Sequence, residues 1–390
     1  LGVFGAALMP CTLSLLRGMF ADRDQRRLAI AIWATGFAAG GAIGPVVGGA
    51  LLEHAFWGSV FLLAVPFLLP LLVLAPILVR ESSDPNPGPF DVVAIALSIG
   101  TFGPIVYGIK HLATAGFDAV AVGSFALGLL SGTLFVRRLL KQDNPLLDVR
   151  LFALPAFTGS VLVNLMSVFS FVGLLYFLSQ HLQLVLGLSP MNAGLVLVPG
   201  TVAMVAASLL VVRWVKRVPP AMLMGIGLAL AGAAYAIFAL RGGDATIAMI
   251  ITAFALLSMG IGMAETLSND IIVAAVPAEK AGAASAVSET SYELGAVLGT
   301  SVLGGVLAAG YAANLTIPAG VSVADAAQAS ETLAGALTVA DRISGEVGAA
   351  LAASAKHAFD SGVVATSVVG VVLAVGAAVL ALWTVRGQRA

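Results

Sequence analysis

Four carboxylates of this sequence lie well inside long apolar stretches rather than at their ends: Glu265, Asp270, Glu289 and Glu293. If these stretches cross a membrane, each ionised carboxylate costs about 3 kcal/mol or more near the middle of its helix. Acidic residues at such positions are therefore candidates for binding protons or cationic ligands.

Glu289 and Glu293 form the most informative pair, because they are four residues apart and would lie on one face of a helix. Repulsion between like charges, together with burial, should keep one of the two carboxyls protonated near neutral pH. Such a carboxyl can take up and release protons, and its ionised form attracts cations. A polar helix face beside a water-filled cleft, with no role in coupling, remains the alternative.

Glu265 and Asp270 lie in the half of the apolar stretch 246–275 that is nearer its cytoplasmic end. We expect Glu265 to take part in the same chemistry, and Asp270 is a weaker candidate because it could lie at the membrane interface. Two aromatic residues and an amide complete the candidate site. Asn164 and Phe171 are seven residues apart and share a helix face, and Tyr292 lies between the two glutamates.

These aromatic faces, combined with carboxylates, would suit delocalised organic cations. Simple packing of the aromatic rings against lipid or neighbouring helices is the alternative for each one singly.

The elements that must position these side chains are membrane helices. The chain has 390 residues, of which 59% are hydrophobic and 10% charged, and its mean hydropathy is +1.04. This composition predicts an all-α, polytopic membrane helix bundle. We expect eleven spans, at residues 1–20, 28–52, 57–79, 90–109, 117–137, 156–182, 190–212, 219–240, 246–275, 281–311 and 361–385.

Other classes of protein find little support in the composition. A net charge of −1 gives no footprint for nucleic acid, and one cysteine and four scattered histidines give no metal-ligand spacing. The sequence contains no GxxxxGK[ST] motif for ATP phosphates. We therefore expect no cofactor, no metal and no catalytic residues. A channel or a membrane enzyme is the alternative of a different class, but neither a ring of charges nor a convergent catalytic set is visible.

The basic residues predict the orientation of the spans. With the loop after the first span in the cytoplasm, fifteen of the 19 lysines and arginines lie on cytoplasmic segments. The four on external segments are Lys110, Arg241, Arg342 and Lys356.

A glycine motif lies in the second span. Gly40, Gly44 and Gly48 recur every four residues and predict a face that allows close approach of another helix. Pro45 removes a backbone donor and should bend the helix, and Gly49 extends the small surface. The string GGAIGPVVGG resembles the antiporter motif G-x-x-x-G-P-x-x-G-G in the fifth helix of drug exporters of the major facilitator superfamily. The segment VSETSYELG, at 287–295, is similar to the acidic stretch of quaternary-ammonium exporters.

The resemblance implies a major facilitator fold of the fourteen-helix drug:proton antiporter branch, running from the fourth helix to the fourteenth. Its parts would be the remainder of the N-terminal half (1–80), two extra helices with a cytoplasmic connector (81–150), and the C-terminal half (151–390). The chain begins within an apolar run, without Met, and is expected to be truncated. Segment 28–52 matches 283–307 at eight of 25 positions, as duplicated halves would.

An external loop, 313–356, interrupts the C-terminal half and could contain short helices at 323–340 and 343–355.

The function that the resemblance implies is proton-coupled efflux of lipophilic cationic drugs and dyes across the cytoplasmic membrane, by a monomer that works by alternating access. Its partners would be small cations, protons and the lipid bilayer. Export of one specific antibiotic or endogenous metabolite is the alternative within the family.

Overall fold

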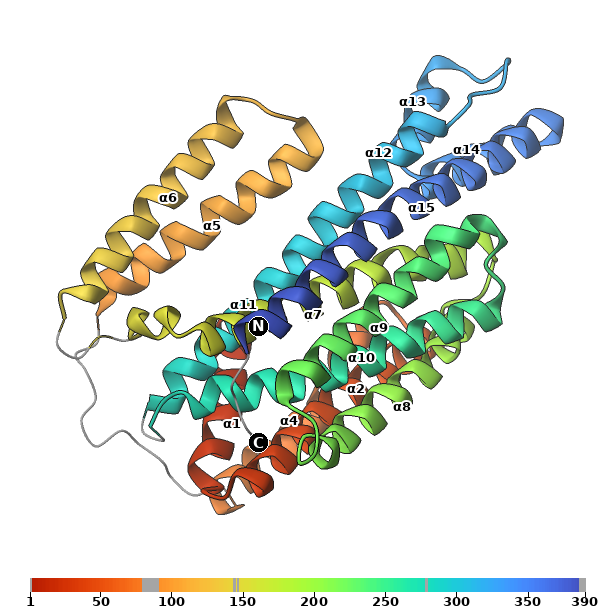
Figure 1. Cartoon of the computed structure of the whole chain (residues 1–390). Helices are drawn as coiled ribbons and strands as arrows, with labels where there is room; N and C mark the ends of the chain where they lie inside the picture. Colours follow the sequence, from red (N-terminus) through yellow and green to blue (C-terminus); the bar gives the residue numbers. More distant parts are fainter. Residues whose placement is uncertain (1, 79–90, 143–144, 146, 278–279, 386–390) are drawn as a thin grey trace.

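The computed structural model describes residues 2–385 except 79–90, 143–144, 146 and 278–279, and every regular element in these ranges is helical (Figure 1). The longer helices are α1 (Gly2–Met19), α2 (Arg23–His54), α4 (Val65–Leu78), α5 (Val92–Ala115), α6 (Ala119–Leu140), α7 (Pro155–Gln180), α8 (Pro190–Trp214), α9 (Pro220–Arg241), α10 (Ile247–Ala274), α11 (Ala281–Leu298), α12 (Gly304–Asn314) and α15 (Gly345–Thr384). The all-α membrane bundle expected from composition is confirmed.

Eight helical stretches of the described residues are long and apolar enough to cross a membrane. They coincide with the last eight expected spans, from 90–109 onward. Side-chain caps fix several of their starts, because a helix leaves its first N–H groups without partners. Ser189 caps α8 by accepting from the backbone N–H of Asn192, and Thr246 caps α10 by accepting from that of Met249.

The third expected span, 57–79, is not a single helix. A four-residue helix, α3 (Ser59–Leu62), ends before Ala64, and α4 begins at Val65. Pro66 explains the new start, since proline lacks an N–H and fits the first turn of a helix, where that donor has no partner. The sequence reading missed this break because the whole segment is apolar.

The external segment also differs from the expected arrangement. Its first helix is divided into α13 (Val323–Glu331) and α14 (Leu333–Ile343) by Thr332, whose backbone is extended and whose side chain accepts from the Gly335 N–H. The second expected helix does not exist separately. The chain turns at Ser344 and Gly345, both with positive φ, and then runs as one 40-residue helix, α15, through the last span.

Two helices, α5 and α6, pack mainly against each other and stand apart from the rest of the bundle (Figure 1). Asp91 caps α5 and accepts a hydrogen bond from the Nε of Arg138 at the end of α6, at 2.7 Å. That hydrogen bond holds the pKa of Asp91 well below its usual range. At the opposite end of the pair, the hydrogen bond with His111 lowers the pKa of Asp118, the cap of α6. An ion pair thus closes one end of this helical hairpin and a side-chain hydrogen bond closes the other.

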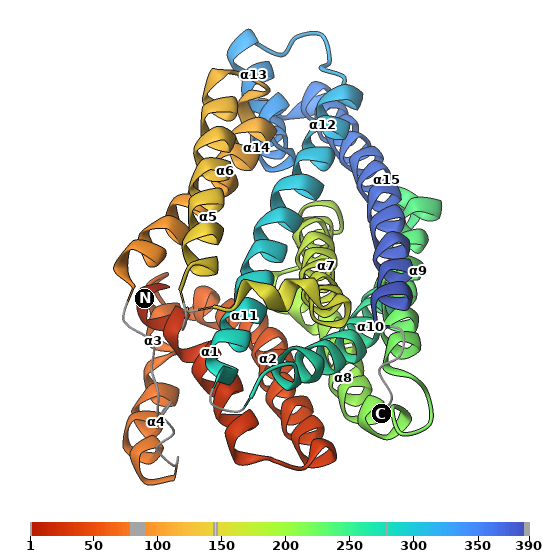
Figure 2. The ribbon, with the colours of Figure 1, turned by 60° about the vertical axis from the view of Figure 1, so that its left-hand side comes forward.

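The remaining helices form the main bundle, in which α9 packs between α10 and α15, and α2 packs along α8. Buried aromatic residues fill its core, where Phe177 contacts Phe238 edge to face and the Tyr235 hydroxyl donates to the Ser170 carbonyl oxygen. Figure 2 shows α13 and α14 at one end and the α1–α2 and α8–α9 turns at the other. We call the second the basic end, because it carries Arg23, Arg26, Arg27, Arg213 and Lys216.

Candidate functional site

The candidate carboxylates are positioned by two neighbouring helices, α10 and α11. Glu265 of α10 and Glu289 of α11 are half-buried, whereas Glu293, one turn further along α11, is exposed. The charge of Glu289 interacts with those of both Glu265 and Glu293. The expected pair on α11 therefore extends to a third carboxylate on α10, so that three of the four candidates form one electrostatic group.

A network of buried amides and hydroxyls lies beside this group and connects α7, α10 and α11. Asn164 is fully buried, and its Nδ2 donates to Asn269 Oδ1 at 3.2 Å and to Ser288 Oγ at 2.8 Å. The Ser288 hydroxyl donates in turn to Asn269 Oδ1 at 2.6 Å, and Ser268 Oγ donates to Asn164 Oδ1. With these polar atoms paired, the network fixes the rotation of the three helices relative to one another.

Asn269 links this network to the carboxylates. Its Nδ2 donates to the hydroxyl oxygen of Tyr292 at 2.5 Å. Tyr292 in turn lies within electrostatic reach of Glu265 and Glu289. The structure thus brings together five of the expected site residues: Asn164, Glu265, Glu289, Tyr292 and Glu293.

Asp270 lies outside this group, and its assignment to the coupling or binding site stays a prediction that no contact with the other three carboxylates supports. Only 1% of its side chain is exposed, and Arg26 and Arg27 of α2 donate to its two oxygens at 3.2 and 2.8 Å. Arg23 is 3.6 Å from the same carboxylate. Asp270 therefore serves as the counter-charge of an arginine cluster that joins α10 to α2 at the basic end.

Phe171 also lies apart from the carboxylates. Its ring packs against Phe254 of α10, with a centroid distance of 5.8 Å, at the edge of the apolar core. Although Asn164 and Phe171 are on the same side of α7, two helical turns separate them, and Phe171 belongs to a different layer. The observed contact with Phe254 agrees with the alternative given for the aromatic residues, which is simple packing against neighbouring helices.

The glycine motif shows close packing at one of its positions. A methyl group added at Gly40, Gly44 or Gly48 would meet no described atom within 4 Å, whereas one at Gly49 would lie 3.0 Å from the Met191 backbone nitrogen of α8. The side chain of Pro45 is outside the described residues, and α2 continues without a break to His54.

The repeat partners of Gly40 and Gly44 do show the expected close approach. Methyl groups added at Gly295 and Gly299 would come within 2.5 and 2.6 Å of carbonyl oxygens of α7. The glycine spacing of segment 28–52 predicted a close helix contact, and in the structure that contact is made by the repeated segment, 283–307.

The sequence did not reveal two sets of residues that contact the candidate side chains. Ser268, Asn269 and Ser288 are polar positions in apolar helices, and that polarity was the available signal. Arg26 and Arg27 were counted only for orientation, although two adjacent arginines at the start of a span could have suggested an acidic partner. Among the described residues, no three of His, Cys, Asp and Glu lie close enough together to hold a metal ion.

Comparison with known proteins decides the family. A sequence model of the Major Facilitator Superfamily matches residues 1–300. The chain is also 52% identical over 378 residues, 97% of its length, to the multidrug efflux pump LfrA of Mycolicibacterium smegmatis, and it covers 75% of that protein. The chain belongs to the major facilitator superfamily. It is therefore a multi-pass membrane protein of a transporter family.

Two further relatives of this major facilitator chain are named for resistance or export. It is 32% identical over 361 residues to the methyl viologen resistance protein SmvA of Salmonella typhimurium, covering 92% of the chain and 73% of the relative. It is 33% identical over 312 residues to the tetracenomycin C resistance and export protein of Streptomyces glaucescens, covering 79% of the chain and 57% of the relative.

Proposed function

We propose that this chain exports lipophilic cationic drugs in exchange for protons, as a monomer in the cytoplasmic membrane, and that it is a transporter rather than an enzyme. The observation that carries the proposal is the group formed by Glu265, Glu289 and Glu293 on two adjacent helices. Intramembrane carboxylates are costly, and three of them in electrostatic contact mark a place where positive charge or protons are needed. The chain would correspond to the fourth to fourteenth helices of a fourteen-helix exporter, divided at residues 80 and 150 as expected.

In this mechanism the carboxylates alternate between two states. When ionised, Glu289 and Glu265 attract a cation, and when protonated they lose that attraction and release it. Like-charge interaction between them favours uptake of a proton by one member of the group when no cation is bound. The hydrogen bond from Asn269 holds Tyr292 so that its hydroxyl and aromatic ring lie beside the glutamates. Cation binding and proton binding would thus compete at one place.

The relatives support the class of substrate. One is named as a multidrug pump, and another is named for resistance to methyl viologen, which is a delocalised aromatic dication. A site that combines carboxylates with a tyrosine suits such ligands. Export of one compound is the second candidate, since a third relative is named for tetracenomycin C. A growth-inhibition panel of unrelated cations would separate the two, because a single-compound exporter protects against one compound only.

The decisive experiment is efflux of a cationic dye from cells that lack other pumps and express this protein, with and without an uncoupler. Efflux against the gradient should stop when the uncoupler is added. Glu289→Gln keeps the shape of the side chain and removes its titration, so it should stop uphill efflux while downhill exchange continues. Glu331→Gln, at an exposed carboxylate of α13, removes the same charge far from the site and should behave as the unchanged protein.

Glu293→Gln and Glu265→Gln complete the series. If Glu289 serves only as the counter-charge of the cation, the Glu289→Gln variant should lose transport of dications more readily than transport of monocations. It should still move neutral substrates against their gradient. Proton-driven efflux that is unchanged in all three single variants and in the triple variant would refute the proposed coupling site.

A further inference from the structure

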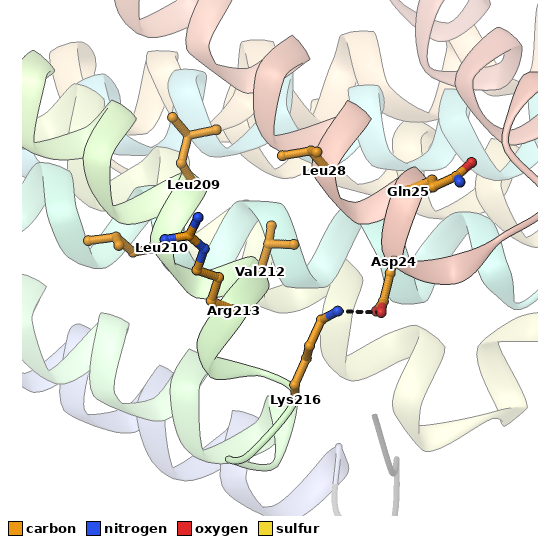
Figure 3. A pocket seen from close by; sticks show the side chains of 8 residues that line it. All are labelled: Asp24, Gln25, Leu28, Leu209, Leu210, Val212, Arg213 and Lys216. Carbon is orange, nitrogen blue, oxygen red and sulfur yellow. Dashed lines mark hydrogen bonds and ion pairs between the residues drawn. The ribbon is translucent and has the colours of Figure 1, made fainter.

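A groove between α2 and α8 at the basic end is not used by the proposed transport mechanism. Its volume is about 590 Å³ (Figure 3). Leu28 of α2 and Leu209 and Leu210 of α8 line one part of it, and all three are partly exposed. Asp24, Arg213 and Lys216 line the other part. The groove is therefore apolar at one side and charged at the other.

This polarity follows the direction of the expected membrane span. Leu209 and Leu210 lie about one turn before Arg213, and α8 ends one residue later, at Trp214. The leucines consequently lie inside the apolar span, while Arg213 and Lys216 lie at its end, at the depth of lipid headgroups. Figure 3 shows the guanidinium of Arg213 between the leucines and Lys216. A ligand that fits must have an apolar part and an anionic part in the same order.

The charges of the groove define the anion. Lys216 Nζ is 2.5 Å from Asp24 Oδ2, and this hydrogen bond lowers the pKa of Asp24 and keeps it ionised. Arg213 is exposed and makes no hydrogen bond or ion pair with the described residues. Two cations and one carboxylate leave a net charge of +1, which one phosphodiester neutralises. The free guanidinium of Arg213 can bind two oxygens of a phosphate at once.

We propose that this groove binds one monoanionic phospholipid, with its phosphate on Arg213 and an acyl chain along the leucines. Basic pockets between membrane helices on the cytoplasmic side are suited to anionic headgroups. The exposed amide of Gln25 lies beside the charged part and can hydrogen-bond a headgroup hydroxyl, as in phosphatidylglycerol. Phosphatidylethanolamine fits less well, because the carboxylate that its ammonium would need is already paired with Lys216. The bound lipid would bridge α2 and α8.

The test is native mass spectrometry of the purified, delipidated full chain, titrated separately with phosphatidylglycerol, phosphatidylethanolamine and phosphatidylcholine. We expect one retained phosphatidylglycerol per chain, bound about tenfold more tightly than either zwitterionic lipid. Arg213→Gln should remove that preference. Arg137→Gln, an exposed arginine at the end of α6, makes the same charge change outside the groove and should keep it. Asp24→Asn should strengthen binding, because it raises the net charge of the groove.

Inorganic phosphate and glycerol phosphate distinguish a lipid site from a simple anion site. Neither should displace phosphatidylglycerol at equal concentration, and displacement would overturn the proposal in favour of a phosphate site. Equal loss in the Arg213→Gln and Arg137→Gln variants, or equal binding of the three lipids, would also overturn it. Should Arg213→Gln fail to fold, Leu210→Gln decides instead, since a polar wall should weaken lipid binding and leave phosphate binding unchanged.

Discussion

Replacement of Asp270 by asparagine tests the arginine cluster at the basic end. The carboxylate is 1% exposed, and the side chains of Arg26 and Arg27 are 4% and 2% exposed. Removal of one partner of a buried ion pair costs about 3–5 kcal/mol, because the other charge remains buried without compensation. Here the substitution leaves two buried cations, so we expect the folding equilibrium constant to fall by about a hundredfold or more.

The assay is equilibrium unfolding of the purified full chain in detergent micelles, followed by tryptophan fluorescence. Trp33 is a local reporter, because it lies on α2 and its indole N–H donates to Thr12 of α1. Asp24→Asn is the matched control: Asp24 lies on α2 beside the arginines, its exposed carboxylate is 4.0 Å from Arg27 and pairs with Lys216, and exposed ion pairs contribute little. We expect no measurable change for Asp24→Asn.

A second variant measures the coupling directly. Arg27→Gln added to Asp270→Asn should cost less than the sum of the two single changes, because it removes one of the uncompensated cations. If Asp270→Asn unfolds like Asp24→Asn, the cluster does not stabilise the fold and the reasoning is refuted. A stable Asp270→Asn protein that has lost proton-driven efflux would return Asp270 to the coupling site.

Two further predictions concern packing and topology. Gly295→Leu should strongly lower the amount of folded protein, because even a methyl group there would lie 2.5 Å from the Leu165 carbonyl oxygen. Gly44→Leu should fold normally, because the space around Gly44 is open. It should still stop transport if another helix packs against the glycine motif during the transport cycle. Equal yields of folded protein would contradict the packing difference. A cysteine at the exposed Val323 should react with a membrane-impermeant reagent added outside intact cells, whereas one at the exposed Lys141 should not; the reverse labelling would overturn the orientation.

The sequence was sufficient to locate most of the fold, because hydropathy is a local property. Every expected span from 90–109 onward corresponds to an apolar helix. The spacing of Glu289 and Glu293 was likewise a local signal, and α11 carries both residues without interruption.

Contacts between distant segments left no such signal. The hydrogen bond between Arg27 and Asp270 joins residues 243 positions apart, and no sequence pattern near Asp270 predicts it. The role of Asn269 as the link between Asn164 and Tyr292 depends in the same way on how three helices face one another. The break at Thr332 was missed for another reason, since alanine-rich sequence on both sides favours a continuous helix and a single capping residue decides otherwise.

The isolation of the α5–α6 hairpin has a consequence for how the chain can vary through evolution. Only 11% and 17% of the most apolar 18-residue segments of these two helices are buried, against 22% for the α11–α12 stretch and 39–56% for the other apolar stretches of the main bundle. Most of their side chains face away from the rest of the protein, so substitutions there need only preserve hydrophobicity, the ion pair at one end and the hydrogen bond at the other. We expect these helices to diverge faster than the main bundle among homologous exporters. Deletion of the hairpin, with its flanking ends rejoined, should be tolerated better than loss of any other helix pair.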